Sequence, residues 1–409
     1  MILKKLLSLL VVLSLSAVLA TAQTSIFPEV YSLNPQLLQS SKKLLSKGDP
    51  LFRKPFEALI KKADQALTEG PFTVVTKEKL PPSSDKHDYM SMGPYWWPNP
   101  NTPNGLPYIR KDGERNPELK KFEDRENIAK LIGAVKSLSL AYYFTENEKY
   151  AQHAALLLKA WFLNPDTRMN PNLNFGQSIP GITDGRAEGL IETVGLIDVV
   201  DGIGILKNSK SLSDSDLISL RKWFADYLKW INESTVGKDE IAAGNNHGTW
   251  CDAQSIAYAL FSQQPEEARR IVETRGYQRL NLQILEDGRQ PRELARTLSW
   301  NYSNMNLKAF FTLANLAKKI DIDLMNYKSK GIVPLHQALD FLVPYLKEAK
   351  KWENKQIKPM EYDNTCFSLR MGTLNYHDPV YEELIRKYDQ TDATDLTYFL
   401  WPIVQQDQP

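Results

Sequence analysis

Cysteine is scarce in this sequence, and neither sign of charge is in excess. Two cysteines among 409 residues, Cys251 and Cys366, are too few for a scaffold stapled by disulfides. We interpret them as two buried thiols, with pairing in an oxidising compartment as the alternative. There is no CxxC, no HExxH and no Asp-rich calcium loop, so the sequence predicts no metal site and no cofactor.

Basic and acidic residues nearly balance, at 50 and 49, for a net charge of +1. A nucleic-acid-binding domain would carry a broad basic excess, so no nucleic-acid partner is predicted. Local clusters of arginine and lysine remain compatible with a polyanionic substrate.

Long apolar runs are also missing, except at the start of the chain. Lys4 and Lys5 precede an apolar run over 6–19, and small residues follow up to Ala22. This order is typical of a signal peptide over 1–22, and the run is short for a membrane span. We expect an exported protein, periplasmic or extracellular, without a membrane anchor and monomeric.

The rest of the chain is dominated by helical periodicity. Apolar residues recur every three or four positions, the mark of one buried helical face. The expected helices cover 124–144, 148–162, 185–200, 213–234, 250–263, 265–285, 303–318, 334–348 and 379–387. Long linkers over 164–183 and 288–299 are expected to be functional. We predict a single all-α domain over 23–409, an (α/α)7-type toroid or incomplete barrel of antiparallel helical hairpins with a cleft formed by long loops. A helical-repeat solenoid is the alternative, but no fixed sequence period supports it.

Segment 85–116 is rich in proline and aromatic residues and cannot form a regular helix. Aromatic faces stack on pyranose rings, so we interpret the segment as a wall of a carbohydrate cleft. Burial of the same rings against the helices is the alternative, most of all for Trp96. The candidate substrate-binding residues here are His87, Tyr89, Tyr95 and Trp97.

Two short runs carry the candidate catalytic groups. In the first, Asn246 and His247 stand just before a predicted helix, where an amide and an imidazole can point at one place. Helix capping by Asn246 or Thr249 is the structural alternative.

The second run contains Arg289, Arg292, Arg296 and Tyr302. Its basic residues are all arginines, which favours bidentate carboxylate recognition. Pairing of these arginines with Glu286, Asp287 or Glu293 in the loop itself is the alternative. Together the two runs suit removal of a proton from a carbon next to a carboxylate, as in a uronic-acid polysaccharide.

These runs, Asn-Asn-His-Gly-Thr-Trp and Glu-Leu-Ala-Arg-Thr-Leu-Ser-Trp-Asn-Tyr-Ser, resemble the signature pair of the alginate lyase superfamily with an α/α toroid fold. Stretches 87–100 and 179–189 are similar to the same group, and the resemblance covers residues 50–390. It points most closely to polysaccharide lyase family 38 and more distantly to family 5.

By motif position, the resemblance implies a catalytic set of Asn246, His247, Arg296 and Tyr302. The spacing from arginine to tyrosine differs slightly from that of family 5, which leaves Arg292 as a substitute for Arg296. Gln177 and Arg186, on the other long loop, would line adjacent subsites beside Trp97.

The implied reaction is β-elimination in a 4-linked polyuronate, most of all alginate, with glucuronan as an alternative. Asn246 and Arg296 would offset the carboxylate, and Tyr302 would protonate the leaving oxygen. For guluronate His247 would be the base, and for mannuronate Tyr302 would serve as both base and acid.

Two other functions stay open at this point. An inverting glycoside hydrolase on a helical toroid would need two spaced carboxyl groups, offered by Glu188 and Glu192 or by Asp252. We expect the two glutamates to be hydrogen-bonded structural residues beneath the cleft. A sugar-binding protein without catalysis is the other alternative.

Overall fold

The structure, a computed structural model, describes residues 27–388 and 396–403. The predicted signal peptide at 1–22 lies outside the described residues. In the part that is described, no helix is both long and apolar enough to cross a membrane.

The fold is almost entirely helical, as predicted. Its α-helices are α2 (Pro35–Ser46), α3 (Pro50–Ala66), α4 (Glu123–Thr145), α5 (Glu148–Leu158), α6 (Leu196–Leu206), α7 (Asp214–Glu233), α8 (Thr235–Ala242), α9 (Asn246–Phe261), α10 (Pro265–Ile271), α11 (Tyr277–Gln283), α12 (Pro291–Leu294), α13 (Ser299–Ala317), α14 (Pro334–Leu346), α15 (Asp363–Tyr376), α16 (Pro379–Tyr388) and α17 (Leu396–Leu400). Short 3-10 or π segments are η1 (Pro117–Lys121), η2 (Lys159–Leu163), η3 (Ala187–Thr193), η4 (Val272–Gly276) and η5 (Lys318–Ile320).

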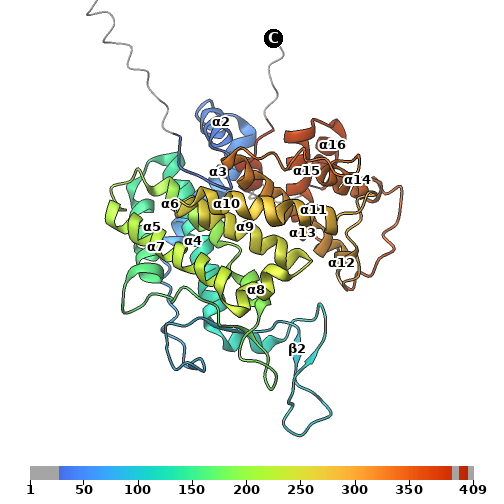
Figure 1. The fold of residues 1–409 in the computed structure, drawn as a ribbon. Coiled ribbons are helices and arrows are strands. Elements are labelled where there is room, and N and C mark those ends of the chain that lie inside the picture. The colour runs from blue at the N-terminus through green and yellow to red at the C-terminus, as the bar shows by residue number, and fades with distance from the viewer. Residues whose placement is uncertain (1–26, 389–395, 404–409) are drawn as a thin grey trace, which may run out of the picture.

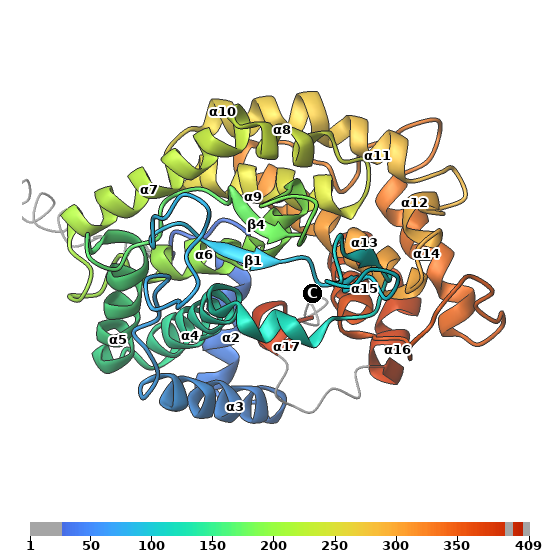
Figure 2. The same ribbon diagram turned by 90° about the horizontal axis from the view of Figure 1, so that it is seen from below.

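The helices form two concentric layers (Figures 1 and 2). Helices α4, α6, α9, α13 and α15 contact one another in sequence order and make the inner layer, while α3, α5, α7, α10, α14 and α16 cover them from outside. The inner helices α9 and α13 are buried on nearly every face, including Trp300, Phe310 and Phe311. Burial of each such side chain contributes about 1.5–3 kcal/mol to folding. The α/α toroid predicted from the sequence is confirmed.

In the described part of the chain, four short strands lie among the loops. Strand β1 (Met90–Met92) pairs in parallel with β4 (Phe175–Ser178), beside it in Figure 2, and this pairing joins segments 85–116 and 164–183. Strands β2 (Trp96–Trp97) and β3 (Ile109–Arg110) form an antiparallel pair within the first segment, with β2 at the lower end of the molecule in Figure 1. The two long loops therefore have a backbone framework of their own.

Several predicted helices begin or break at other places than expected. The helix expected over 185–200 is split into η3 and α6, and the one over 265–285 contains a π turn at η4. Helix α9 begins at Asn246 and α13 at Ser299, several residues earlier than predicted. His247 therefore lies in the first turn of α9, and Tyr302 lies in the first turn of α13. Cys251 and Cys366 are both buried thiols that are not joined by a disulfide, as interpreted from the sequence.

Candidate active site

A cleft of about 1270 Å³ opens at the end of the toroid that carries the long loops. It is lined by segment 85–116, the loop before η3, the start of α9, and the residues just before and within α13. Its basic residues are Arg110, Arg115, Arg125, Arg186, Arg296 and Lys358. The lining also carries the carboxylates Glu188, Glu192, Asp239, Glu240 and Glu361, so an anionic ligand would be bound by individual arginines and not by an excess of positive charge.

The turn between α8 and α9 is shaped by Gly248, at the start of α9, and by the buried Arg279. A Cβ on Gly248 would lie 2.0 Å from the carbonyl oxygen of Ala243 and 2.2 Å from Nη1 of Arg279, so no larger residue fits. Arg279 donates hydrogen bonds to the carbonyl oxygens of Ala243 and Ile241, each at 2.6 Å. These contacts hold the turn rigidly and fix where the first residues of α9 point.

His247 is oriented by a buried carboxylate. Its Nδ1 lies 2.8 Å from Oε1 of Glu240, which is only 1% exposed. Burial raises the pKa of Glu240, and the hydrogen bond to His247 acts in the opposite direction. When the ionised Glu240 accepts a hydrogen bond from Nδ1–H of His247, Nε2 carries no proton and is free to accept one.

Asn246 is held by a second buried carboxylate. Glu293 accepts from the backbone N–H of Asn246 at 2.6 Å and from its Nδ2 at 2.8 Å. Burial raises the pKa of Glu293, while both hydrogen bonds from Asn246 lower it. The Oδ1 of Asn246 is buried and makes no hydrogen bond in the structure, although this residue lines the cleft. An orphaned acceptor at this position is suited to a donor group on a ligand.

Tyr302 meets a second phenol and a guanidinium. Its hydroxyl donates to the hydroxyl of Tyr95 at 3.0 Å, and the guanidinium carbon of Arg296 lies 3.7 Å from its ring centroid. Burial raises the pKa of Tyr302 above its ordinary value, Tyr95 raises it further, and Arg296 lowers it. The net effect keeps Tyr302 protonated, the form needed to give a proton to a leaving group.

Arg296 links two loops that are far apart in the sequence. Its Nε and Nη2 donate to the two carboxylate oxygens of Asp112 at 3.2 and 2.8 Å. The hydroxyl of Thr297 adds a hydrogen bond to Asp112 at 2.9 Å. Asp112 belongs to segment 85–116, so this contact holds the proline-rich segment against the start of α13.

On the opposite wall, Arg186 is fixed by three neighbours. It donates to Oε1 of Gln177 at 2.6 Å and to Glu188 at 2.7 Å, and its guanidinium lies 6.0 Å from the ring centroid of Trp96. Gln177 takes a left-handed backbone conformation with φ of 49°. A non-glycine residue in this conformation is uncommon and often marks a functional position.

The sequence model of the alginate lyase family matches residues 73–352 of this chain. The chain is 36% identical to an alginate lyase from Bacteroides ovatus whose crystal structure is known. The match covers 92% of this chain and 100% of that one, with a TM-score of 0.88. This chain belongs to the alginate lyase family.

More distant lyases share the fold alone. The alginate lyase A1-III from Sphingomonas species A1 is 15% identical, with 92% of this chain and 97% of that one covered and a TM-score of 0.55. A histidine-to-alanine variant of alginate lyase A1-III, complexed with a tetrasaccharide, is 14% identical, with 93% and 98% covered and a TM-score of 0.57. A search of curated proteins found no match.

Most residues predicted for the active site of this lyase come together in the cleft. The lining includes Tyr95, Gln177, Arg186, Asn246, His247, Arg296 and Tyr302. The first signature run, with Asn246 and His247, and the second, with Arg296 and Tyr302, therefore meet in the cleft as expected. The role of each side chain stays a prediction.

One predicted aromatic contact, that of Trp97, is wrong in position. Trp97 does not line the cleft, since its indole Nε1 donates to the carbonyl oxygen of Glu114 at 3.0 Å and Lys111 lies over its ring. Trp96, the neighbouring residue of β2, lines the cleft instead. Successive residues of a strand face opposite sides, so only one of the two indoles can face the substrate.

Three other candidates also lie outside the cleft lining. Tyr89 is fully buried beneath it and donates to Glu192 at 2.7 Å, and His87 bonds through Nδ1 to the carbonyl oxygen of Arg168 at 2.6 Å. The exposed Arg292 packs its guanidinium against the backbone of Gly244. It does not replace Arg296, which lines the cleft itself.

The carboxylates offered for a hydrolase are occupied elsewhere. Glu192 accepts from the hydroxyls of Tyr89 and Ser91 and pairs with Arg125, as expected of a hydrogen-bonded structural residue, but it lines the cleft and does not lie beneath it. Glu188 lines the cleft and pairs with Arg186. The fully buried Asp252 is ion-paired with Arg275 and Arg279.

Sequence reasoning missed the groups that support the catalytic side chains. Glu240 and Asp112 belong to no motif, and Asp112 meets Arg296 only because the fold joins positions far apart in the chain. The one available signal was the glutamate at the start of the second run, which is Glu293. The alternative that pairs Glu293 with a loop arginine is wrong, because Glu293 binds Asn246, whereas Arg289 does pair with Asp287 as that alternative expected.

Proposed function

We propose that this protein is a polysaccharide lyase that cleaves the 4-linked uronates of alginate by β-elimination. The observation that carries the proposal is the meeting of His247, Tyr302 and Arg296 in one arginine-rich cleft. An imidazole, a phenol and a guanidinium supply a base, an acid and a charge offset without a metal or cofactor.

For guluronate the reaction divides between two residues. Nε2 of His247 takes the C5 proton, the C4–C5 double bond forms, and the C4–O4 bond breaks. The proton of the Tyr302 hydroxyl passes to the leaving O4. The products are a new free hydroxyl and a 4,5-unsaturated uronate, so the atoms balance without water.

For mannuronate the C5 proton and the leaving oxygen lie on one face of the sugar ring. Tyr302 would then take the proton as a phenolate and return it to O4. Burial opposes this route in the empty cleft because it raises the pKa of Tyr302. Arg296 beside the ring favours the phenolate, so mannuronate cleavage depends on that guanidinium more than guluronate cleavage does.

The substrate carboxylate needs an offset for its own charge before C5 becomes acidic. Nε and Nη2 of Arg296 donate to Asp112. Nη1 is left to donate to the substrate carboxylate. Asn246 already donates its backbone N–H and its Nδ2 to Glu293, so its unpaired Oδ1 would accept from a sugar hydroxyl, and the charge offset rests on Arg296. Trp96 and Arg186, on the opposite wall, would bind a neighbouring sugar by stacking and by charge.

The comparisons support this proposal at two levels. The Bacteroides ovatus protein is described as an alginate lyase, and its sequence aligns over nearly the whole of this chain. Alginate lyase A1-III has been crystallised with a tetrasaccharide in histidine-to-alanine and tyrosine-to-phenylalanine variants, which supports a sugar-binding role for this fold. We also propose membership of polysaccharide lyase family 38, export through the signal peptide at 1–22, and a monomer.

The test is a substrate screen with purified protein on polymannuronate, polyguluronate and glucuronan. Ultraviolet absorbance of the unsaturated product is followed together with new reducing ends. Equal increases in both on an alginate block, lost in Tyr302→Phe, are expected. Reducing ends without absorbance would show a hydrolase, and absorbance on glucuronan alone would move the substrate away from alginate.

A further inference from the structure

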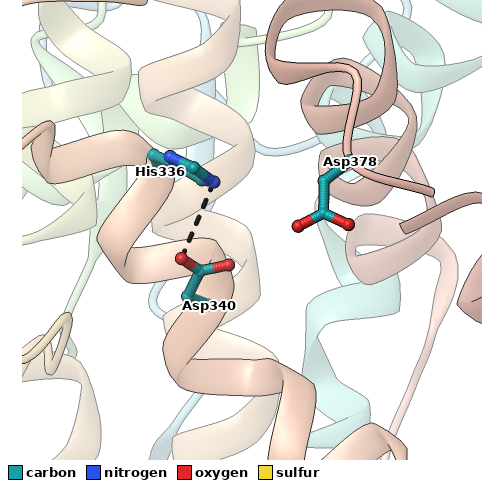
Figure 3. Close-up of side chains that lie close together, drawn as sticks. All are labelled: His336, Asp340 and Asp378. Atoms are coloured by element: carbon teal, nitrogen blue, oxygen red, sulfur yellow. Dashed lines mark ion pairs between the residues drawn. The ribbon is translucent and has the colours of Figure 1, made fainter. Parts of the chain in front are cut away.

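A second cluster of chemically active side chains lies on another part of the fold. His336 and Asp340 are one turn apart on α14, and Asp378 directly precedes α16 (Figure 3). None of the three lines the catalytic cleft. Each offers one ligand atom, and these atoms all lie within 4.8 Å of one another.

The contacts of the cluster leave three ligand atoms facing one point. Nε2 of His336 is buried and makes no hydrogen bond, and it lies 3.6 Å from Oδ2 of Asp340. The other oxygen of Asp340 accepts from the hydroxyl of Tyr381, and Oδ1 of Asp378 accepts from the backbone N–H of Val380 at 2.9 Å. Figure 3 shows Nε2 of His336 and the carboxylate of Asp378 turned toward each other across the gap between the two elements.

Aromatic packing holds the imidazole in this direction. The His336 ring stacks on Tyr376 with centroids 4.3 Å apart and planes at 21°, and Tyr381 meets it edge-on at 6.1 Å. Neighbours that fix both the histidine ring and an acidic ligand are typical of metal sites. A buried ring nitrogen without a donor or acceptor is otherwise unfavourable.

We propose that His336, Asp340 and Asp378 bind a divalent transition-metal ion of the zinc type. One imidazole nitrogen and two carboxylate oxygens suit such an ion, whereas calcium prefers six to eight oxygen ligands. Ligand atoms around tetrahedral zinc lie roughly 3.3 Å apart. The 3.6 Å between His336 and Asp340 is near this value, and the half-exposed position leaves room for a water as fourth ligand.

The two carboxylates would neutralise the dication, and the ion would join α14 to the turn between α15 and α16. Its effect would be on stability, because binding to the folded state alone raises the free energy of unfolding. The site is independent of the proposed lyase reaction.

The experiment is a calorimetric titration of chelator-treated protein with zinc chloride, repeated with calcium chloride. We expect one zinc per chain, an increase in melting temperature, and calcium binding that is weaker or absent. His336→Ala and Asp378→Asn should each weaken zinc binding at least ~10-fold, since even outer-shell changes cost that much. Asparagine at 378 can still accept the hydrogen bond from Val380, so this variant keeps the start of α16.

The matched control is His377→Asn, which removes the neighbouring exposed histidine. His377 has a φ of 56°, a conformation that asparagine tolerates. Its zinc affinity should equal that of the unmodified protein. The proposal is overturned if zinc fails to bind, or if Asp378→Asn binds zinc as tightly as the control does. Alginate cleavage should be the same with and without zinc, so loss of lyase activity is a separate result.

Discussion

The reactive side chains of the cleft are held by acids that themselves stay out of the chemistry. Glu240 bonds to His247, Glu293 to Asn246, and Asp112 to Arg296. Each pairing restricts one side chain to one orientation, which lowers the entropy lost when substrate binds. At the scale of single residues, a small set of substitutions therefore separates direct roles from supporting ones.

The first substitution concerns the two phenols. Tyr302→Phe removes the acid that protonates O4 and should lower kcat by ~10²–10⁴-fold with the fold intact. Tyr95→Phe removes only the hydroxyl that accepts from Tyr302, so its loss should be smaller. Both are measured by the increase in absorbance on polyguluronate and polymannuronate. Near-normal turnover of Tyr302→Phe on every polyuronate would exclude Tyr302 as the acid.

The second concerns the imidazole and its carboxylate. His247→Ala should impair guluronate cleavage more than mannuronate cleavage, because only the anti route needs a base opposite Tyr302. Glu240→Gln should reduce guluronate cleavage by ~10–150-fold, the range for losing one charge-assisted hydrogen bond. Rates on the two block types are compared for each variant. Equal losses on both would mean that His247 mainly offsets charge or orients Tyr302.

The third concerns pH. Tyr302 must be protonated as the acid for guluronate, and its raised pKa keeps it protonated as the pH rises. We expect kcat/KM on polyguluronate to show no alkaline decline up to about pH 10, the ordinary value for tyrosine. On polymannuronate, a phenolate base predicts a rate that still rises there. A decline on polyguluronate centred below about pH 9 would contradict this assignment.

At the scale of elements, the loop before α13 separates two arginines by function. Arg296 lines the cleft, whereas Arg292 packs against Gly244 outside it. Arg296→Ala should cost about 1.5–3 kcal/mol in kcat/KM, or ~10–150-fold, and Arg292→Ala should leave it nearly unchanged. Melting temperature is measured alongside, because Arg296 also pairs with Asp112. A large drop in melting temperature with full activity of the folded remainder would make Arg296 a structural residue.

Strand β2 provides a matched aromatic pair. Trp96→Ala removes a cleft-facing indole and should raise KM for alginate, since loss of a stacking contact costs about 0.5–1.5 kcal/mol. Trp97→Ala changes a side chain of the same size on the other face of the strand and should change KM little. The reverse order of effects would show that β2 turns on binding substrate.

The elements themselves were largely predictable. Apolar spacing located α4 and α7 within one residue at each end, because one buried face imposes that spacing, but it did not predict α3 or α15. Helix starts at α9 and α13 were missed, since their first turns are polar residues that face the cleft or carboxylates such as Glu293. Local propensity gives way there to tertiary contacts.

At the scale of the whole molecule, the cleft unites stretches that lie between Pro94 and Asn364 in the sequence, and this limits what can be predicted from sequence. Asn246, His247 and Tyr302 were found because they occur in two compact runs. Asp112 and Trp96 were not assigned, because their positions depend on how segment 85–116 folds over the toroid. No local pattern in the sequence specifies contacts that bridge such separations.

The hydrogen bonds from Arg296 and Thr297 to Asp112 attach segment 85–116 to the start of α13. Enzyme turnover therefore depends on whether this segment stays in place. The apolar core of the helical layers does not include Asp112, Arg296 or Thr297. Mild heating or rising ionic strength can therefore detach the segment first, so catalysis would fade while circular dichroism still records a full helical signal. A stored preparation checked only by circular dichroism would therefore be taken as native after it had lost its activity.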